Sequence, residues 1–172
     1  MTAIIKKLKN LKQVSLKLSS VTEAQRIAVL NTLANLLDEH SELIVKHNQL
    51  DLAKMNNDDP RYDRLLLTTP RINAIANDIR KVALLESPLN KILITKTLAN
   101  GLQLVKKSVP LGVVAVIYEA RPNVTIDVFS LCFKSGNAVV LKGGSDAWES
   151  NQILVQLIWQ SLRENHLDID IV

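Results

Sequence analysis

The first half of the chain is patterned as helix. Near the N-terminus, apolar residues recur at intervals of three and four, which is the spacing of an amphipathic helix. Its polar face is basic and carries Lys6, Lys7, Lys9, Lys12 and Lys17. We expect this helix to pack its apolar side on the domain and to leave its lysines in water; binding to a membrane surface is the alternative.

Two further helical stretches follow. Helix is expected over 22–53, with an interruption near His40-Ser41, because an apolar stripe runs along it and Thr22 and Gln25 fit a capping box. The next helix opens at Thr69 with Pro70 in its first turn, where the missing N–H carries no cost.

A β-hairpin is expected after these helices. Residues 92–98 and 102–109 are extended candidates, and they are joined by Asn100-Gly101. The Asn-Gly pair predicts a type I′ turn, in which both central residues need a positive φ. A two-stranded hairpin is marginal alone, so it should lean on another surface, for example a neighbouring subunit.

The pattern changes again from Pro110. Residues 112–117 and 138–141 are short continuous apolar runs, which are typical of parallel strands covered on both faces. Between them, residues 124–134 fit a helix stopped by Ser135-Gly136.

A long helix is expected over 146–165, with Asp146 as N-cap and Glu149 completing a second capping box. Residues 169–172 then look like the start of a third strand. The expected fold class is therefore α/β: N-terminal helices and a hairpin, then half (βαβαβ) of a doubly wound parallel sheet.

These elements suggest three segments. They are an N-terminal helical segment (1–91), the hairpin (92–109) and a partial nucleotide-binding α/β domain (110–172). A length of 172 residues suits one domain with a small appendage.

Composition narrows the functional classes. The chain is 47% hydrophobic and 22% charged, which argues against disorder. A net charge of +4 and an aromatic fraction of 3% give neither a strong basic patch nor a stacking platform, so no nucleic-acid partner is expected. The sequence has neither a membrane-length apolar run nor a signal peptide, and it contains a single cysteine. From these features we expect a reducing, cytoplasmic compartment.

The first candidate site is Lys142-Gly143-Gly144-Ser145, between an expected strand and helix. Ligands of open α/β sheets bind at the carboxyl ends of the strands. Two glycines would admit a ligand close to the backbone, while Ser145 and free helix N–H groups could bond phosphate or ribose oxygens. The alternative is an ordinary βα turn with an exposed lysine, since neither GxGxxG nor GxxxxGK[ST] occurs.

The second candidate site is the loop 118–123, also at the end of a strand. Asn123 could donate its amide to a developing oxyanion, and Arg121 could clamp a carboxylate or phosphate. As an alternative, Asn123 is simply the N-cap of the following helix.

Other reactive side chains give no site. Cys132 lies among apolar neighbours inside an expected amphipathic helix with no nearby histidine, so we interpret it as structural. The histidines His40, His47 and His166 show no metal-ligand spacing, and Asp58-Asp59 lacks the glycine and glutamate of a calcium loop. No metal site is expected.

Residues 110–147, PLGVVAVIYEARPNVTIDVFSLCFKSGNAVVLKGGSDA, closely resemble the gamma-glutamyl phosphate reductase (glutamate-5-semialdehyde dehydrogenase) family of the aldehyde dehydrogenase superfamily. The stretches 63–68 and 98–102 also look like this family, so the resemblance covers nearly the whole chain. The combination of YEARPN with LCFKSGNAVVLKGG is specific for this branch.

The resemblance implies an NADPH-dependent reduction of L-glutamate 5-phosphate to the 5-semialdehyde and phosphate, in proline biosynthesis. A cysteine thiolate attacks the acyl phosphate, phosphate leaves, and hydride reduces the thioester. Asn123 matches the oxyanion-hole asparagine and Lys142 the lysine that holds the adenosine ribose. Ser145 stands where NAD-preferring relatives carry glutamate, which would admit a 2′-phosphate. The hairpin resembles the family's oligomerisation strands, so a homo-oligomer is expected of the full-length form.

One departure is large. Family members are more than twice as long, and their catalytic cysteine lies in a later domain that this sequence lacks; Cys132 does not match it. The resemblance therefore implies an N-terminal portion that is inactive alone. The alternative is a non-catalytic nucleotide-binding or oligomerisation fragment.

Overall fold

The computed structural model describes residues 2–172, with side chains from residue 4 onward; Met1 lies outside the described residues. The helical half confirms the sequence pattern, and its elements are α1 (Thr2–Lys17), α2 (Glu23–Glu39), α3 (Ser41–Leu52), α4 (Tyr62–Leu65) and α5 (Thr69–Leu84). The expected interruption falls at His40, between α2 and α3. The capping box is present, because the backbone N–H of Gln25 donates to Thr22 and the Gln25 side chain accepts from the N–H of Thr22.

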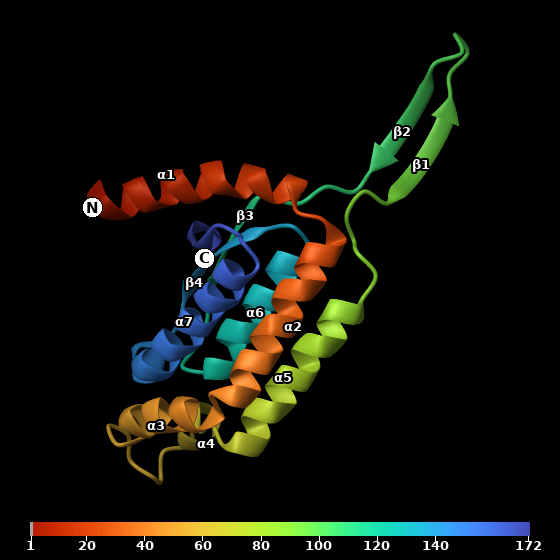
Figure 1. Ribbon diagram of the computed structural model, residues 1–172. Helices are drawn as coiled ribbons and strands as arrows, with labels where there is room; N and C mark the ends of the chain where they lie inside the picture. The colour runs from red at the N-terminus through yellow and green to blue at the C-terminus, as the bar shows by residue number, and fades with distance from the viewer. Residues whose placement is uncertain (1) are drawn as a thin grey trace.

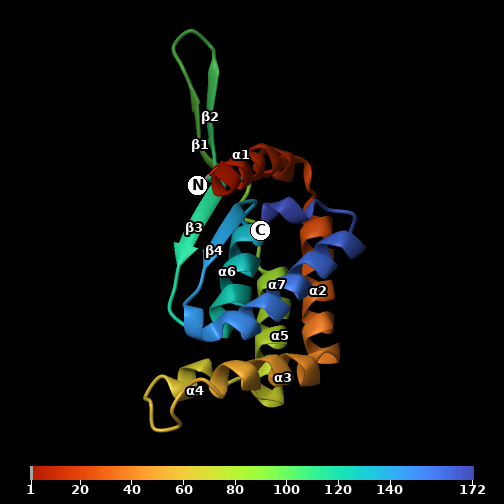
Figure 2. The ribbon, with the colours of Figure 1, turned by 90° about the vertical axis from the view of Figure 1, so that its left-hand side faces the viewer.

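The second half forms the expected strand, helix, strand, helix order. Its elements are β3 (Val113–Ile117), α6 (Pro122–Lys134), β4 (Ala138–Lys142), a 3-10 turn (Ser145–Ala147) and α7 (Trp148–Glu164). The two strands pair in parallel, with Val113 opposite Ala138 and Ile117 opposite Lys142. Both strands therefore end at the same edge, on the side of the molecule where α3 and α4 lie (Figure 2).

The third strand is not formed. Residues Ile169–Ile171 make a 3-10 turn, in which the Asp168 side chain accepts a hydrogen bond from the N–H of Asp170. Asp168 pairs with Lys17, and Asp170 accepts a hydrogen bond from Asn10, so polar contacts tie this turn to α1. Contacts with α1 take the place of the expected third strand, and the parallel sheet of the described residues has two strands.

The hairpin is present but its turn differs from the prediction. Strands β1 (Ile92–Thr97) and β2 (Gln103–Lys107) pair antiparallel. The N–H of Gly101 bonds the carbonyl of Leu98, and the N–H of Leu98 bonds the carbonyl of Leu102. Gly101 has a φ of 85°, whereas Asn100 is not among the residues with positive φ. A three-residue loop with glycine in the left-handed region therefore replaces the type I′ turn.

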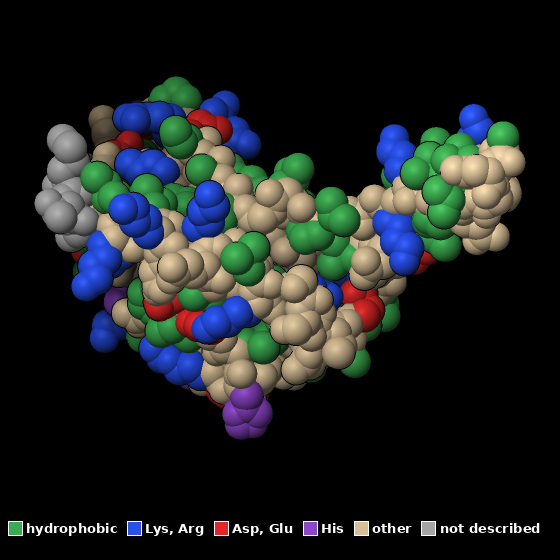
Figure 3. Space-filling model, turned by 90° about the horizontal axis from the view of Figure 1, so that it is seen from above, with side chains coloured by type: hydrophobic (Ala, Val, Ile, Leu, Met, Phe, Trp, Pro, Cys, Tyr) green, Lys and Arg blue, Asp and Glu red, His purple; other side chains and the backbone are tan. Residues whose placement is uncertain are grey.

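The hairpin stands away from the body (Figure 1). Every residue of both strands is exposed. Seen from above, apolar side chains gather on this arm together with several lysines or arginines (Figure 3).

One main core joins the helical half to the sheet. It contains buried residues from Leu11 to Ile171, including the stacked rings of Phe129 and Phe133. α2 and α5 run side by side in this core (Figure 1). The strands are not covered on both faces as expected: Ala138 and Val139 are buried, but Ile117 is 84% exposed.

Candidate functional site

Two loops meet at the carboxyl ends of the paired strands. The first, 118–121, leads from β3 into α6, and the second, 143–147, leads from β4 into α7. The N–H of Tyr118 donates to the carbonyl of Lys142 at 3.1 Å, which extends the strand pairing by one bond. The structure therefore brings the two sequence-predicted sites together at the edge where ligands of such sheets bind.

The two glycines serve contact between these loops. A Cβ on Gly144 would lie 2.8 Å from the backbone nitrogen of Ala120. A Cβ on Gly143 would lie 2.5 Å from Nδ2 of Asn151 and 3.2 Å from the Tyr118 ring. Protein atoms lie where a side chain at either position would begin, so the two glycines allow the loops to pack close together.

A series of side-chain hydrogen bonds stabilises this loop packing. The hydroxyls of Tyr118 and Thr125 lie 2.7 Å apart, and the Thr125 hydroxyl donates to Oδ1 of Asn151 at 2.7 Å. Burial raises the pKa of Tyr118, while its hydrogen bond with Thr125 opposes the shift. These contacts join the first loop to both α6 and α7, and they fix the orientation of the loop.

Lys142 and Ser145 supply polar donors at the end of β4. The Lys142 ammonium is exposed and donates to the carbonyl of Gly143 at 2.9 Å. The Ser145 hydroxyl is exposed, and its contact with Asp146 is long, at 3.5 Å. Both groups keep donor capacity for a ribose hydroxyl or a phosphate oxygen. The two side chains could therefore hold a sugar or phosphate group of a nucleotide.

Asn123 is not the helix N-cap. α6 begins at Pro122, so Asn123 lies inside its first turn and Arg121 takes the cap position without a side-chain cap bond. Nδ2 of Asn123 donates to Oδ2 of Asp127 at 3.2 Å. Burial raises the pKa of Asp127, with its hydrogen bond from Asn123 acting against the shift. The other N–H of the Asn123 amide stays available to a ligand.

A pocket of about 360 Å³ brings Asn123 and Arg121 together with α4 and α5. Its lining residues are Asp63, Arg64, Leu66, Leu67, Arg71, Ala74, Ile75, Arg121 and Asn123. Arg64 and Arg71 were not predicted as site residues. Arg64 belongs to the family-like stretch 63–68, Arg71 lies outside it, and no local motif indicates that either arginine lines a pocket with Arg121.

The three arginines of this pocket differ in their partners. Arg71 makes three hydrogen bonds, to the carbonyls of Asp63 and Leu66 and to the Asp63 carboxylate. Arg64 and Arg121 instead share one carboxylate, that of Glu119. Arg71 therefore serves the connection between α4 and α5, while the other two guanidinium groups are only partly used.

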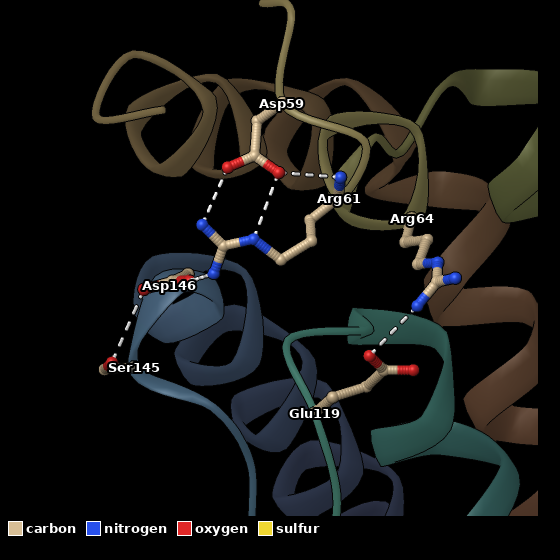
Figure 4. A network of polar contacts seen from close by, with 6 residues as sticks. All are labelled: Asp59, Arg61, Arg64, Glu119, Ser145 and Asp146. Carbon is tan, nitrogen blue, oxygen red and sulfur yellow. Dashed lines mark hydrogen bonds and ion pairs between the residues drawn. The ribbon is translucent and has the colours of Figure 1, made fainter. Parts of the chain in front are cut away.

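Ion pairs hold residues 56–65 against both loops (Figure 4). Arg61 forms two side-chain hydrogen bonds with Asp59, and its Nη1 lies 3.1 Å from Oδ2 of Asp146. Arg64 bonds Glu119 at 3.3 Å. Hydrogen bonds from Arg61 lower the pKa of Asp59 to about 2. Asp58-Asp59 therefore lies in a turn in which Asp59 is bonded to Arg61.

α7 has a different cap from the one expected. Asp146 lies in the 3-10 turn, and α7 begins at Trp148 without a cap from its own side chains. Asp51 of α3 performs this role, because its carboxylate accepts hydrogen bonds from the N–H groups of Glu149 and Ser150 at 3.1 and 2.8 Å. The second capping box is therefore wrong, and the cap comes from a distant part of the chain.

Cys132 stays outside this arrangement. It lies in α6, is half-buried, and burial raises the pKa of its thiol. It is not among the residues that line the pocket of Arg121 and Asn123. Across the part of the chain that the structure describes, no group of three or more His, Cys, Asp or Glu side chains could hold a metal ion.

Comparison with known proteins gives relatives along nearly the whole chain. The chain is 52% identical over 167 residues to the gamma-glutamyl phosphate reductase of Chlorobium phaeobacteroides, covering 97% of this chain and 40% of the relative. It is 50% identical over 171 residues to the protein of that name from Legionella pneumophila strain Lens, covering 99% and 41%. No protein-family model matches.

Comparison with solved structures gives relatives of the same name. The gamma-glutamyl phosphate reductase of Thermotoga maritima superposes with a TM-score of 0.92 at 30% identity, covering 98% of this chain and 41% of that one. The Saccharomyces cerevisiae protein of that name gives 0.90 at 26% identity, covering 97% and 44%. A benzaldehyde dehydrogenase of Corynebacterium glutamicum, at 21% identity and a TM-score of 0.73, covers 96% and 34% and shows the shared fold.

The chain thus spans about 40% of the length of the curated relatives it matches. Among residues 2–172, no helix is long and apolar enough to cross a bilayer.

Proposed function

Because the chain belongs to the gamma-glutamyl phosphate reductase family, we propose that it supplies part of an enzyme that reduces L-glutamate 5-phosphate with NADPH. The products are L-glutamate 5-semialdehyde and phosphate. This reaction would be a step of L-proline biosynthesis in the cytoplasm. One observation carries the proposal: about 50% identity runs along 97–99% of the chain. The adjacent ends of β3 and β4 support it, because they bring the candidate residues of both sites to one edge.

The cofactor residues are Lys142 and Ser145, with Gly143 and Gly144 shaping the loop between them. Their free donors suit a ribose hydroxyl and a 2′-phosphate, and a serine at 145 brings no carboxylate against that phosphate. Bound NADPH would supply the hydride.

The substrate residues are Asn123 and Arg121. The Asn123 amide would donate to the oxygen of the reacting acyl group, as an oxyanion hole does. Arg121 would bind an anionic group of L-glutamate 5-phosphate. The pocket that both residues line is consistent with these roles.

The nucleophile is a separate matter. Cys132 is the single cysteine of the sequence, and its raised pKa disfavours a thiolate. We therefore propose that the 172 residues are inactive alone and that turnover needs the remainder of a family member.

The division into 1–91, 92–109 and 110–172 gives each segment a role in this proposal. The helical segment covers the sheet and its loops, and the last segment carries the cofactor residues. The hairpin exposes apolar side chains, which would join subunits of a homo-oligomer; these are Ile92, Leu93, Ile94, Leu102, Leu104 and Val105.

The test is an assay in the reverse direction, with L-glutamate 5-semialdehyde, phosphate and NADP⁺. The pure chain should show no turnover. Adding the remaining 60% or so of the Legionella pneumophila relative should restore NADPH formation, and Asn123→Ala should abolish it. Turnover by the chain alone would overturn the proposed division of roles, and no turnover in the mixture would contradict the proposed function.

A second candidate is a non-catalytic nucleotide-binding or oligomerisation module. Two observations favour it: Lys142 offers donors at the end of β4, and burial raises the pKa of Cys132, the cysteine of the described residues, which disfavours a nucleophilic thiolate. NADPH binding by the isolated chain, with no turnover in the complemented mixture, would support it.

A further inference from the structure

We infer that Arg64, on the short helix α4, is the second guanidinium of an anion clamp that it forms with Arg121, and that Glu119 is the internal competitor of that clamp. The inference deepens the proposed function, on which it rests for the identity of the substrate. It concerns which residues hold an anionic group of that substrate, a carboxylate or a phosphate.

The clamp is built on one shared carboxylate. Nη1 of Arg64 donates to Oε2 of Glu119 at 3.3 Å (Figure 4), and Nε of Arg121 lies 2.6 Å from Oε1 of the same group. The second contact is an ion pair outside hydrogen-bonding geometry, since the Nε–H of Arg121 has no acceptor in the structure. Two positive charges thus share one negative charge, and neither pairing is bidentate.

Both arginines have side-chain donors without a protein acceptor. Within residues 2–172, no protein acceptor is found for Nη2 of Arg64 or for Nη1 and Nη2 of Arg121. Both residues line the pocket of about 360 Å³ together with Asn123. A planar carboxylate or phosphate that entered it would meet the fork geometry that guanidinium groups bind best.

The start of α6 adds to the positive electrostatic potential near the two arginines. Arg121 occupies the N-cap position, and no side chain caps the helix there. The first helical residue, Pro122, has no N–H, and the N–H of Val124 donates to the carbonyl of Arg121. This end of the 13-residue helix therefore contributes the N–H of Asn123 and the partial positive charge of the helix dipole. The lining also includes the apolar residues Leu66, Leu67 and Ile75 and one carboxylate, Asp63, which is paired with Arg71. Arg64 and Arg121 are therefore the cationic lining residues that have Glu119 as their carboxylate partner.

Glu119 then has two effects on the clamp. It keeps two like charges from repelling each other, and it occupies donors that an anion would otherwise take. Its side chain is half-exposed, so it can leave both arginines without losing its solvation. Neutralising it should therefore favour an entering anion.

The test measures anion binding to the pure 172-residue chain, without NADPH, by ¹⁵N–¹H NMR titration. Inorganic phosphate and L-glutamate are titrated separately, which distinguishes a phosphate from a carboxylate as the bound group. We expect shifts at residues 119–124 with either or both probes. Arg64→Gln and Arg121→Gln should each weaken binding roughly tenfold, and Glu119→Gln should strengthen it roughly two- to fivefold.

Arg163→Gln is the matched control, because this exposed arginine of α7 lies outside the pocket lining. Thermal unfolding of each variant confirms that the fold is kept. Equal weakening by Arg163→Gln, or no effect of Arg64→Gln with either probe, would overturn the clamp. Glutamate and phosphate binding with these dependences, in a chain that fails the complementation assay, would leave the clamp standing and remove the proposed function.

Discussion

The carboxylate of Asp51 accepts a hydrogen bond from the backbone N–H of Ser150 at 2.8 Å and a second from the hydroxyl of the same residue, also at 2.8 Å. Asp51 is 1% exposed and lies 99 residues away in the sequence. The amide of Asn48 reaches the same hydroxyl at 3.0 Å. The start of α7, which directly follows the loop 143–147, is thus anchored in α3.

Replacing Asp51 with alanine should destabilise the fold by about 2 kcal/mol, because it removes a helix cap and leaves buried donors without an acceptor. Urea denaturation of the pure chain measures the free energy of unfolding. Asp58→Ala is the control, since Asp58 is exposed in the same connection, and it should change stability by less than about 0.5 kcal/mol. Equal losses in the two variants would show that Asp51 is not a cap.

Gly143 and Gly144, in the loop that follows β4, should differ in the stability that is lost on replacement by alanine. A methyl group on Gly144 meets the backbone of Ala120 at 2.8 Å, whereas one on Gly143 meets the end of the Asn151 side chain. A side-chain end can move and a backbone cannot move without distorting the loop. We expect Gly144→Ala to cost about 2 kcal/mol and Gly143→Ala about 1 kcal/mol or less. Thermal unfolding ranks the two, and the reverse order would contradict the loop packing.

The pKa of Asp59 should be low because of Arg61. Its value of about 2 lies below that of an unfolded aspartate, so its pairing contributes stability above pH 4 and loses that contribution as the pH falls toward about 2. An NMR titration of the carboxylate should show this value, and Arg61→Gln should raise it. An unchanged pKa in the variant would exclude the hydrogen bonds with Arg61 as its cause.

Asp127 should behave in the opposite way. Burial raises its pKa, so the folded state holds the proton more tightly than the unfolded one, and this group lowers stability as the pH rises above about 4. Asp127→Asn removes the buried charge and should flatten this part of the stability profile. Unfolding measured between pH 4 and 7 tests this, with Asp58→Asn as an exposed control. A profile unchanged by Asp127→Asn would exclude this role.

The sequence predicted the elements that depend on local pattern. The stripe of α2, the capping box of Thr22 and the apolar runs of β3 and β4 are all properties of neighbouring residues, and each appears in the structure. It also placed Asn123 and Lys142 at strand ends, because a parallel sheet puts such ends at one edge.

What the sequence missed depends on contacts between distant segments. Asp146 fits a cap by local pattern, but Asp51 takes the role from α3. The Asn-Gly pair suits a two-residue turn, yet the hydrogen bonds of Leu98 select a three-residue loop. Arg64 became a pocket residue only through the fold, which lays α4 against the β3 loop.

The anchoring of both loops by residues 48–64 also bears on how this fold can be divided. Asp51 holds the start of α7, Arg61 reaches Asp146, and Arg64 reaches Glu119. A chimera that joined residues 110–172 to foreign helices would therefore lose the supports of both loops at once. The helical segment and the half-sheet would therefore have to be exchanged together. A crossover point between them would separate the loops 118–121 and 143–147 from the residues that support them.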